Sequence, residues 1–373
     1  MVKVALDATY AAYPERTGTG VYSEKLIWAL ATCLPVEERS RFRLILAFRP
    51  GPYLRWARKR KWPEGFSLSP LLDSWVCLPR ATLFHGLNQR LPEKPYPLQV
   101  VTIHERFPPT SQSYSTPEFQ RHMTTRIESA LRRADRIIAV SHAVRQQLVQ
   151  YDPALDTKIR VIHHGVDSAQ PAPQAEQDTF RQRVLGLGKG EKFFLCVGAI
   201  QTRKNIANIV LALKQLPDFR LVLAGGDGYG AEQIHALIRQ EGMQYRIRTL
   251  GHRQPETLRL LYSAATALVF PSLEEAFGLP ILEAMSYGLP VITSRNSALP
   301  EVAGDAALYV DPQNVSEIGE TMRRVAGDGA LASELSRRGK QRAALFPWEK
   351  CARETWQVYS ELLKDRGLGS GLL

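Results

Sequence analysis

The sequence predicts an α/β protein with two domains, each built on a doubly wound parallel sheet. Its 373 residues exceed what one ordinary hydrophobic core holds and suit two domains of common size. Apolar runs typical of buried parallel strands alternate with helical periodicity from residue 193 to residue 325. Several runs end in polar or glycine-containing turns, and the carboxyl ends of parallel strands are where such sheets bind ligands.

The overall composition is that of a soluble globular protein, with 44% hydrophobic and 23% charged residues. The chain contains no apolar run of about 18 residues, so we expect no membrane-spanning helix. The opening residues, MVKVALDATY, predict a strand rather than a signal peptide. The four cysteines are widely scattered and have neither metal-binding nor disulfide-framework spacing. We therefore expect a cytoplasmic protein.

Basic residues exceed acidic ones by 48 to 37, which gives a net charge of +11. Within the segment Arg55–Trp62, two tryptophans flank a run of four cations. A solvated surface and a patch that meets anionic lipid explain this charge about equally well. Nucleic acid ranks well below both, because no recognition motif accompanies the charge, and we expect no nucleic-acid partner.

The first half contains two features that can take part in ligand binding or catalysis. A predicted strand over residues 2–5 and a predicted helix over residues 21–34 are separated by a loop that contains Gly18 and Gly20. Glycines in such a loop let the backbone approach a phosphate or a sugar. A later apolar strand ends at His104, where a catalytic group or a hydrogen-bonded structural histidine can stand. His85 is interpreted as structural.

The second half follows a proline-marked linker at residues 171–174 and opens with a strand over residues 193–197. A turn of small residues then leads to Arg203 and Lys204. An arginine can bind two phosphate oxygens at once and a lysine adds a point charge, so the pair suits a diphosphate. Adjacent basic residues on a loop are usually only solvated, which is the alternative.

The most informative stretch is residues 268–291, which reads as strand, loop and helix. Pro280 suits the first helical position, and Gly278 allows close backbone approach to a ligand. Glu275 in the loop and Glu283 inside the helix are separated by seven residues and can accept hydrogen bonds from sugar or ribose hydroxyls. Taken alone, such glutamates also serve simply to complement a helix dipole.

The segment PSLEEAFGLPILEA resembles the motif of retaining GT-B glycosyltransferases, especially family 4. Ala276 departs from the pattern, because glycine is frequent at its position. The run Arg203-Lys204-Asn205 and the N-terminal TGTGVY resemble further parts of the same family, and the resemblance covers essentially the whole chain. It implies the GT-B fold, in which two Rossmann-like domains flank a cleft: 1–170 binds the acceptor, 171–346 binds the nucleotide sugar, and a helix in 347–373 crosses back to the first domain.

The resemblance also implies roles for individual residues. The catalytic set is His104, Arg203, Lys204 and Glu275. The donor-binding set is Gly18, Gly20, Arg203, Lys204, Gly251, His252, Glu275, Phe277, Gly278, Leu279 and Glu283. No metal motif accompanies these residues, so we expect no metal ion and no cofactor.

The function implied is hexosyl transfer from a nucleotide diphosphate sugar to a glycan or lipid-linked acceptor, with retention of configuration. GDP-mannose is the first expectation for the donor, because DATY…TGTGVY resembles bacterial mannosyltransferases of surface polysaccharide pathways. The alternatives are a glucosyltransferase that uses UDP-glucose or a related donor, a nucleotide-sugar epimerase of the same fold, and a non-enzymatic basic binding module.

Overall fold

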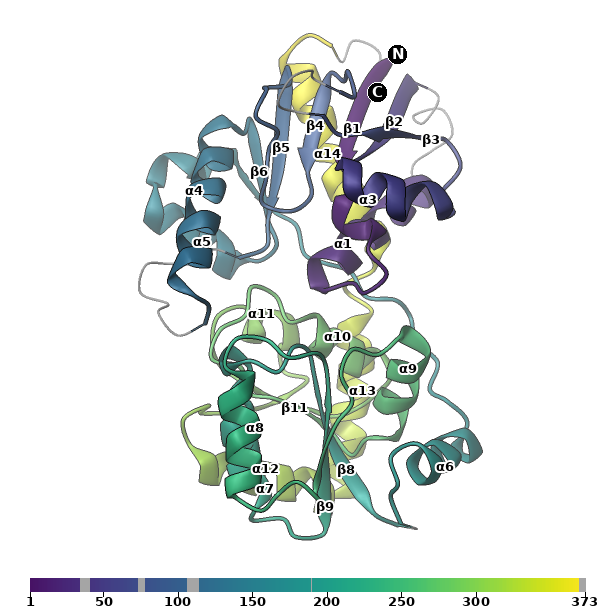
Figure 1. Ribbon diagram of the computed structural model, residues 1–373, viewed down its shortest axis with the longest axis vertical. Helices are drawn as coiled ribbons and strands as arrows, with labels where there is room; N and C mark the ends of the chain where they lie inside the picture. Colours follow the sequence, from purple (N-terminus) through teal and green to yellow (C-terminus); the bar gives the residue numbers. More distant parts are fainter. Residues whose placement is uncertain (34–40, 73–77, 106–113, 189, 369–373) are drawn as a thin grey trace. The chain divides into compact units, whose positions relative to one another are not determined.

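The computed structural model describes residues 1–33, 41–72, 78–105, 114–188 and 190–368 (Figure 1). It divides into two compact units, which confirms the two predicted parallel-sheet domains. The first unit contains Met1–Pro108, Glu118–Gly165 and Phe346–Leu373, and the second contains Pro109–Pro117 and Val166–Leu345. The main division falls a few residues before the predicted boundary at residue 170.

The first unit is built on a seven-stranded parallel sheet with the strand order β3-β2-β1-β4-β5-β6-β7. Its central strands are almost wholly buried, as their continuous apolar sequences predict. The order reverses between β1 and β4, and the carboxyl ends of strands at such a reversal are where open α/β sheets generally bind ligands. The strands are β1 (Val2–Asp7), β2 (Phe42–Phe48), β3 (Phe66–Pro70), β4 (Leu83–Gly86), β5 (Leu98–Ile103), β6 (Arg136–Ala139) and β7 (Ile159–Val161).

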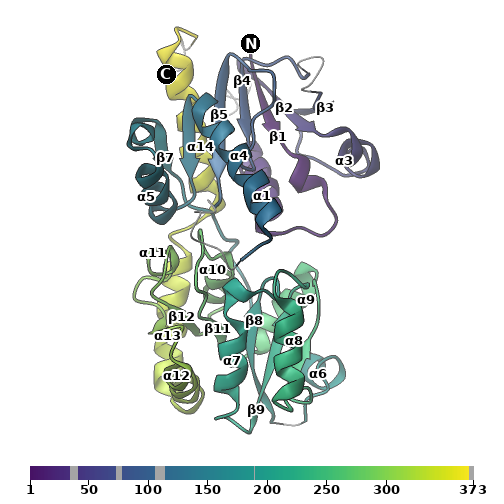
Figure 2. The ribbon, with the colours of Figure 1, turned by 60° about the vertical axis from the view of Figure 1, so that its left-hand side comes forward.

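Helices from both ends of the chain cover the first sheet. The last helix, α14 (Trp348–Asp365), packs against α1 (Gly18–Cys33) and carries a buried apolar face (Figures 1 and 2). Trp356 of this face lies edge-on to Phe42 of β2, with ring centroids 4.5 Å apart. The remaining helical segments are η1 (Thr9–Ala12), α3 (Pro50–Arg55), η2 (Ala57–Lys59), α4 (Pro117–Arg133), α5 (His142–Tyr151) and η3 (Pro153–Lys158).

The second unit is built on a six-stranded parallel sheet with the order β10-β9-β8-β11-β12-β13. Here the order reverses beside β8, and the neighbours β8 and β11 meet at the reversal point. The strands are β8 (Lys192–Val197), β9 (Phe219–Ala224), β10 (Ile247–Thr249), β11 (Leu268–Phe270), β12 (Val291–Ser294) and β13 (Leu308–Val310).

Helices pack on both faces of the second sheet (Figure 2). Apolar residues of α7 (Ile206–Leu213), α8 (Ala231–Gln240) and α12 (Val315–Gly327) share one buried core with β8, β9 and β11. The further helical segments are α6 (Gln174–Arg183), η4 (Thr202–Lys204), α9 (Pro255–Ala264), α10 (Leu279–Ser286), α11 (Leu299–Ala303) and α13 (Gly329–Ala343). Among the described residues, no helix is long and apolar enough to cross a membrane.

Candidate active site

The carboxyl ends of β8 and β11 bring together three residues that lie far apart in the sequence. Arg203 and Lys204 form the short η4 segment after β8, and Glu275 lies in the loop after β11. Lys204 Nζ donates a hydrogen bond of 2.6 Å to Glu275 Oε1. Arg203 donates to Glu275 Oε2 at 3.2 Å and to the backbone oxygen of Glu274 at 3.0 Å. Two cations and one carboxylate thus occupy the point of the sheet where ligands are expected.

The charges of this cluster are buried and mutually stabilised. Lys204 and Glu275 are each 7% exposed, and the Lys204 ammonium also lies over the Phe270 ring, 4.3 Å from its centroid. Burial by itself raises the pKa of Glu275, but Arg203 and Lys204 outweigh it and hold this pKa below its ordinary value. Burial lowers the pKa of Lys204 despite the attraction of Glu275. The cluster has a formal net charge of +1, which favours an anionic ligand.

Backbone and side-chain hydrogen bonds fix the two loops that carry the cluster. Leu273 N donates to the Arg203 oxygen at 2.9 Å, which joins the loops directly. Asn205 adopts a left-handed conformation, with φ of 57°, and its amide donates to the backbone oxygens of Pro271 and Pro312. Such a strained, fully bonded residue gives the Arg203–Lys204 segment one defined position.

The loop after β11 ends at the N-terminus of α10, close in sequence to Glu275. Phe277 is buried, Gly278 is the N-cap residue with φ of 103°, and Leu279 is the first helical residue. The first N–H groups of a helix have no partner inside it, and they carry part of the positive end of its dipole. The described position of Phe277, Gly278 and Leu279 therefore suits the anion-binding role predicted for them.

Glu283 lies in the second turn of α10. Its Oε2 accepts a hydrogen bond of 2.6 Å from the hydroxyl of Tyr262, on α9. Gly251 and His252 follow β10, the edge strand of the sheet; Gly251 has φ of 70° and His252 is exposed. Hydrogen bonds thus join Arg203, Lys204 and Glu275 to one another, whereas Glu283 bonds to Tyr262.

In the first unit, His104 lies directly after β5 and is buried. Its Nε2 is 2.8 Å from the backbone oxygen of Leu87. Because a carbonyl only accepts, Nε2 carries the proton and Nδ1 is the accepting nitrogen. Nδ1 has no hydrogen-bond partner among the described residues. Burial, partly offset by the bond to Leu87, lowers the pKa of His104 to about 4. A neutral imidazole of this kind can accept a bond from a hydroxyl but is a weak general base.

A buried hydrogen-bonded network supports the strand that carries His104. His85 Nδ1 is 2.5 Å from the hydroxyl of Tyr359 on α14, and its Nε2 is 2.8 Å from the hydroxyl of Thr102. The Thr102 hydroxyl is in turn 3.0 Å from that of Tyr22. The Tyr22 ring lies edge-on to His104, with centroids 4.8 Å apart. His85 therefore joins α14, β5 and α1, in agreement with a structural role.

The predicted glycine loop before the first helix is wrong in its boundary, because α1 begins at Gly18 rather than near Val21. Gly18 and Gly20 lie in the first turn of this helix. A Cβ at Gly20 would stand 2.9 Å from the Tyr10 oxygen, so close packing against η1 requires glycine there. The two residues still offer backbone N–H groups at a helix N-terminus, beside the reversal point of the first sheet.

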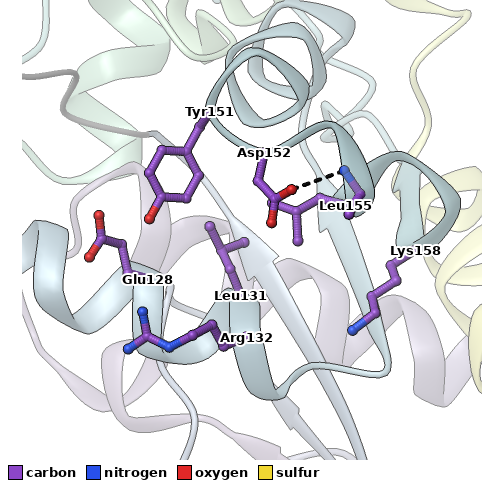
Figure 3. A pocket seen from close by; sticks show the side chains of 8 residues that line it. Glu128, Leu131, Arg132, Tyr151, Asp152, Leu155 and Lys158 are labelled. Atoms are coloured by element: carbon purple, nitrogen blue, oxygen red, sulfur yellow. Dashed lines mark hydrogen bonds between the residues drawn. The ribbon is translucent and has the colours of Figure 1, made fainter.

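A pocket of about 520 Å³ lies elsewhere in the first unit, between α4 and the segment that follows α5 (Figure 3). Glu128, Arg132, Asp152 and Lys158 line it, so its charges balance. It contains none of the predicted site residues. Sequence reasoning did not single out Tyr262, because its partner Glu283 lies 21 residues away in the chain and no motif includes the tyrosine.

Two family models match the chain. The model described as Glycosyltransferase Family 4 matches residues 35–170, and the model described as Glycosyl transferases group 1 matches residues 177–342. Together they span most of both units. The chain belongs to these glycosyltransferases. The Arg203–Lys204–Glu275 cluster and Glu283 all lie within the match to the second model.

Named relatives of this glycosyltransferase include a mannosyltransferase and an inositol phosphate glycosyltransferase. The O-antigen chain mannosyltransferase B of Escherichia coli is 29% identical over 381 residues, which cover 93% of this chain and 96% of that protein. The D-inositol 3-phosphate glycosyltransferase of Mycolicibacterium smegmatis is 31% identical over 238 residues, 62% of this chain and 54% of that protein.

Solved structures show the same fold. Sucrose-phosphate synthase from Thermosynechococcus elongatus has a TM-score of 0.75 and 22% identity, with coverage of 98% of this chain and 100% of that chain. Anabaena HepE in complex with UDP-glucose has a TM-score of 0.73 and 17% identity, with coverage of 97% and 100%. The GT-B fold predicted for the glycosyltransferase is thereby confirmed.

Proposed function

We propose that this glycosyltransferase transfers a mannosyl group from GDP-mannose to a glycan or lipid-linked acceptor, with retention of configuration and without a metal ion. The observation that carries the proposal is the Arg203–Lys204–Glu275 cluster, whose net positive charge lies at the reversal point of the second sheet beside the N-terminus of α10. The likeness to O-antigen chain mannosyltransferase B supports mannose as the sugar.

The cluster can stabilise the diphosphate as it departs. Breaking the bond between the sugar C1 and the diphosphate leaves the bonding electrons, and thus negative charge, on the phosphate. Arg203, Lys204 and the backbone N–H groups of Gly278 and Leu279, where α10 begins, are preorganised donors for that charge. The acceptor oxygen forms the new bond to C1 on the same face, and its proton passes to a phosphate oxygen of the departing diphosphate.

The remaining predicted residues would orient the donor. Glu283 accepts bonds from the ribose hydroxyls, and Glu275, held by its two cations, orients the sugar hydroxyls. His104 accepts a bond from the transferred sugar through Nδ1 and is not required as a base, since its pKa of about 4 leaves it a weak one. Gly251 and His252 contribute to the site of the base.

A thermal-shift screen with GDP, UDP and ADP tests the donor site. A shift from GDP alone, unchanged by EDTA, is the expected result and supports a metal-independent guanine nucleotide site. A shift that needs magnesium overturns metal independence. No shift from any of the three overturns the assignment of Arg203, Lys204 and Glu283. Retention is tested separately by the anomeric configuration of the product.

UDP-glucose is the second candidate donor, because HepE, which shares the fold, is solved in complex with it. A UDP-specific shift in the same screen favours this donor. Both matching family models describe glycosyltransferases, which disfavours the epimerase and the non-enzymatic module. Release of nucleoside diphosphate only when an acceptor is present separates a transferase from an epimerase.

We also propose that the basic segment Arg55–Trp62 meets an anionic membrane surface, which places the enzyme at the cytoplasmic face. Arg55, Arg58, Lys59 and Lys61 are exposed, and Leu54 beside them is 60% exposed. Arg60 instead binds Glu24, and Trp62 packs on Phe48, so only part of the segment is available. Sedimentation with vesicles should require anionic lipid and weaken with salt. Equal binding to zwitterionic vesicles would contradict the proposal.

A further inference from the structure

A buried tyrosine makes direct contact with the carboxylate that is proposed to bind ribose. The Tyr262 hydroxyl, on α9, donates to Glu283 Oε2 at 2.6 Å. Tyr262 is 2% exposed, whereas Glu283 is partly accessible. The bond therefore lies behind the carboxylate on its protein side, where a ligand does not compete for the tyrosine.

The position of the Tyr262 ring is fixed by its surroundings. The Tyr287 ring stacks on it, with centroids 5.5 Å apart and an interplanar angle of 13°. The next residue, Ser263, accepts a bond from Ala172 N at 2.9 Å and donates to Arg259 at 2.7 Å. The residue after Tyr262 thus ties α9 to Ala172, and the stacked Tyr287 ring restricts the tyrosine side chain itself.

The direction of the bond follows from chemistry. An ionised carboxylate has no proton to give, so the tyrosine must donate. Burial raises the pKa of Tyr262 well above its ordinary value, and the neighbouring Glu283 raises it further. The phenol therefore stays protonated. A carboxylate offers about four acceptor positions, so a bond at Oε2 fixes its plane and leaves capacity for further donors.

We propose that Tyr262 is a positioning residue that sets the selectivity of this site for ribose over sugars lacking the 2′- and 3′-hydroxyls. It holds the Glu283 carboxylate in the one orientation in which the two neighbouring hydroxyls of a ribose can donate to it. A vicinal diol needs two acceptor positions at a defined angle, and a carboxylate free to rotate on α10 would offer them only part of the time. The proposal rests on the proposed function, in which Glu283 binds the ribose.

Calorimetric titration of the full-length protein tests it with GDP, UDP and ADP and their 2′,3′-dideoxy forms. For the nucleotide that binds, Tyr262→Phe should raise the dissociation constant of the form with an intact ribose about ten-fold, which is the effect of losing one hydrogen bond to a charged group. The dissociation constant of the dideoxy form should rise less than about two-fold, because this form lacks the hydroxyls that the oriented Glu283 carboxylate would accept. Tyr287→Phe, which leaves the stacking and the Tyr262 hydroxyl in place, is the matched control and should leave both affinities unchanged.

Equal weakening of both forms, or of neither, would overturn the proposal. Glu283→Gln separates its failure from that of the proposed function: if this variant shows no ribose-dependent loss, the ribose assignment itself is wrong. If Glu283→Gln shows the loss and Tyr262→Phe does not, only the positioning role fails. Adding Tyr262→Phe to Glu283→Gln should cost less than about two-fold more, because both changes act on one interaction. A full additional ten-fold loss would contradict that coupling.

Discussion

Lys204 and Glu275 form a buried ion pair in which each charge offsets the cost of burying the other. Removing two charges from water costs several kcal/mol per ion, and the attraction between them offsets much of that cost. The pair therefore adds little stability compared with apolar residues, yet either charge alone would be strongly unfavourable. Such a pair holds charge in place for a ligand, which is what a site for a diphosphate needs.

This dependence is measurable by a double-mutant cycle. Glu275→Gln should lower the free energy of unfolding of the second unit by about 3 kcal/mol, because it leaves the buried Lys204 charge uncompensated. Lys204→Met should cost less, because Arg203 still donates to Glu275. The double variant should lose much less than their sum. Urea unfolding measures all three. Lys214 and Glu241, bonded at 2.5 Å but partly exposed, form the control pair; its removal should cost under about 1 kcal/mol. Additive losses at the buried pair would refute the coupling.

Buried histidines make the first unit sensitive to acid. Burial lowers the pKa of His85 to about 3 and that of His104 to about 4. The unfolded chain binds these protons at about pH 6.5, so it is stabilised relative to the folded chain as the pH falls from there towards about 4. Each histidine should then cost about 1.4 kcal/mol of unfolding free energy per pH unit.

Unfolding free energies measured across this pH range should show that slope, and His104→Gln should reduce it by the share of one histidine. A slope that His104→Gln does not alter would show that this ring does not stay neutral in the folded state.

Sequence reasoning reached Arg203, Lys204 and Glu275 but not their mutual contact. The residue types and their positions after strands predicted a phosphate site, yet nothing in the sequence showed that Glu275 binds both cations. The contact depends on the order of strands, which places β11 beside β8 although β9 and β10 lie between them in the chain. Tyr262 was missed for the same reason, because its role exists only through Glu283.

Element boundaries depend on packing that local sequence preferences do not report. Glycine disfavours a helix interior by about 1 kcal/mol relative to alanine, which led to the late start predicted for the first helix. The close approach of Gly20 to η1 overrides that preference. The start of α10 was predicted to within one residue, at Pro280 instead of Leu279, because a proline in the first turn and a glycine before it are both local signals.

Gly278 is the element boundary on which the donor site depends most. With φ of 103° it adopts a conformation that other residues rarely take, and a Cβ there would stand 3.0 Å from Leu299. Gly278→Ala should therefore lower the unfolding free energy by about 1–2 kcal/mol and weaken nucleotide binding, as the first N–H groups of α10 shift. Gly329→Ala, at a helical position where a Cβ meets nothing within 4 Å, is the control and should be neutral or stabilising. Unchanged nucleotide binding in Gly278→Ala would show that the donor site does not depend on the conformation of this glycine.

At the scale of the molecule, both ends of the chain belong to one unit. Trp356 and Tyr359 of α14 contact Phe42 and His85, which precede the whole second unit in the sequence. Apolar patterning predicted a terminal helix, and the resemblance to the family predicted where it would pack. Sequence alone could not supply that location, since the helix would suit either sheet.

Deleting the chain from Phe346 onward should therefore destabilise the first unit and spare the second. The deletion exposes apolar surface on α1 and β2 and leaves His85 without its Tyr359 partner, which should cost several kcal/mol in total. Calorimetry should show loss of one unfolding transition, and limited proteolysis should leave a resistant fragment close to Val166–Leu345. Parallel loss of both transitions would show that α14 also stabilises the second unit.

The same arrangement sets the order in which a ribosome can deliver a finished protein. The second unit is complete in sequence once Leu345 has emerged, while the first unit still waits for its last helix. The part of the chain synthesised first is thus the last to reach its native structure. During that interval the apolar surface that α14 will cover is exposed to solvent, to chaperones and to neighbouring nascent chains.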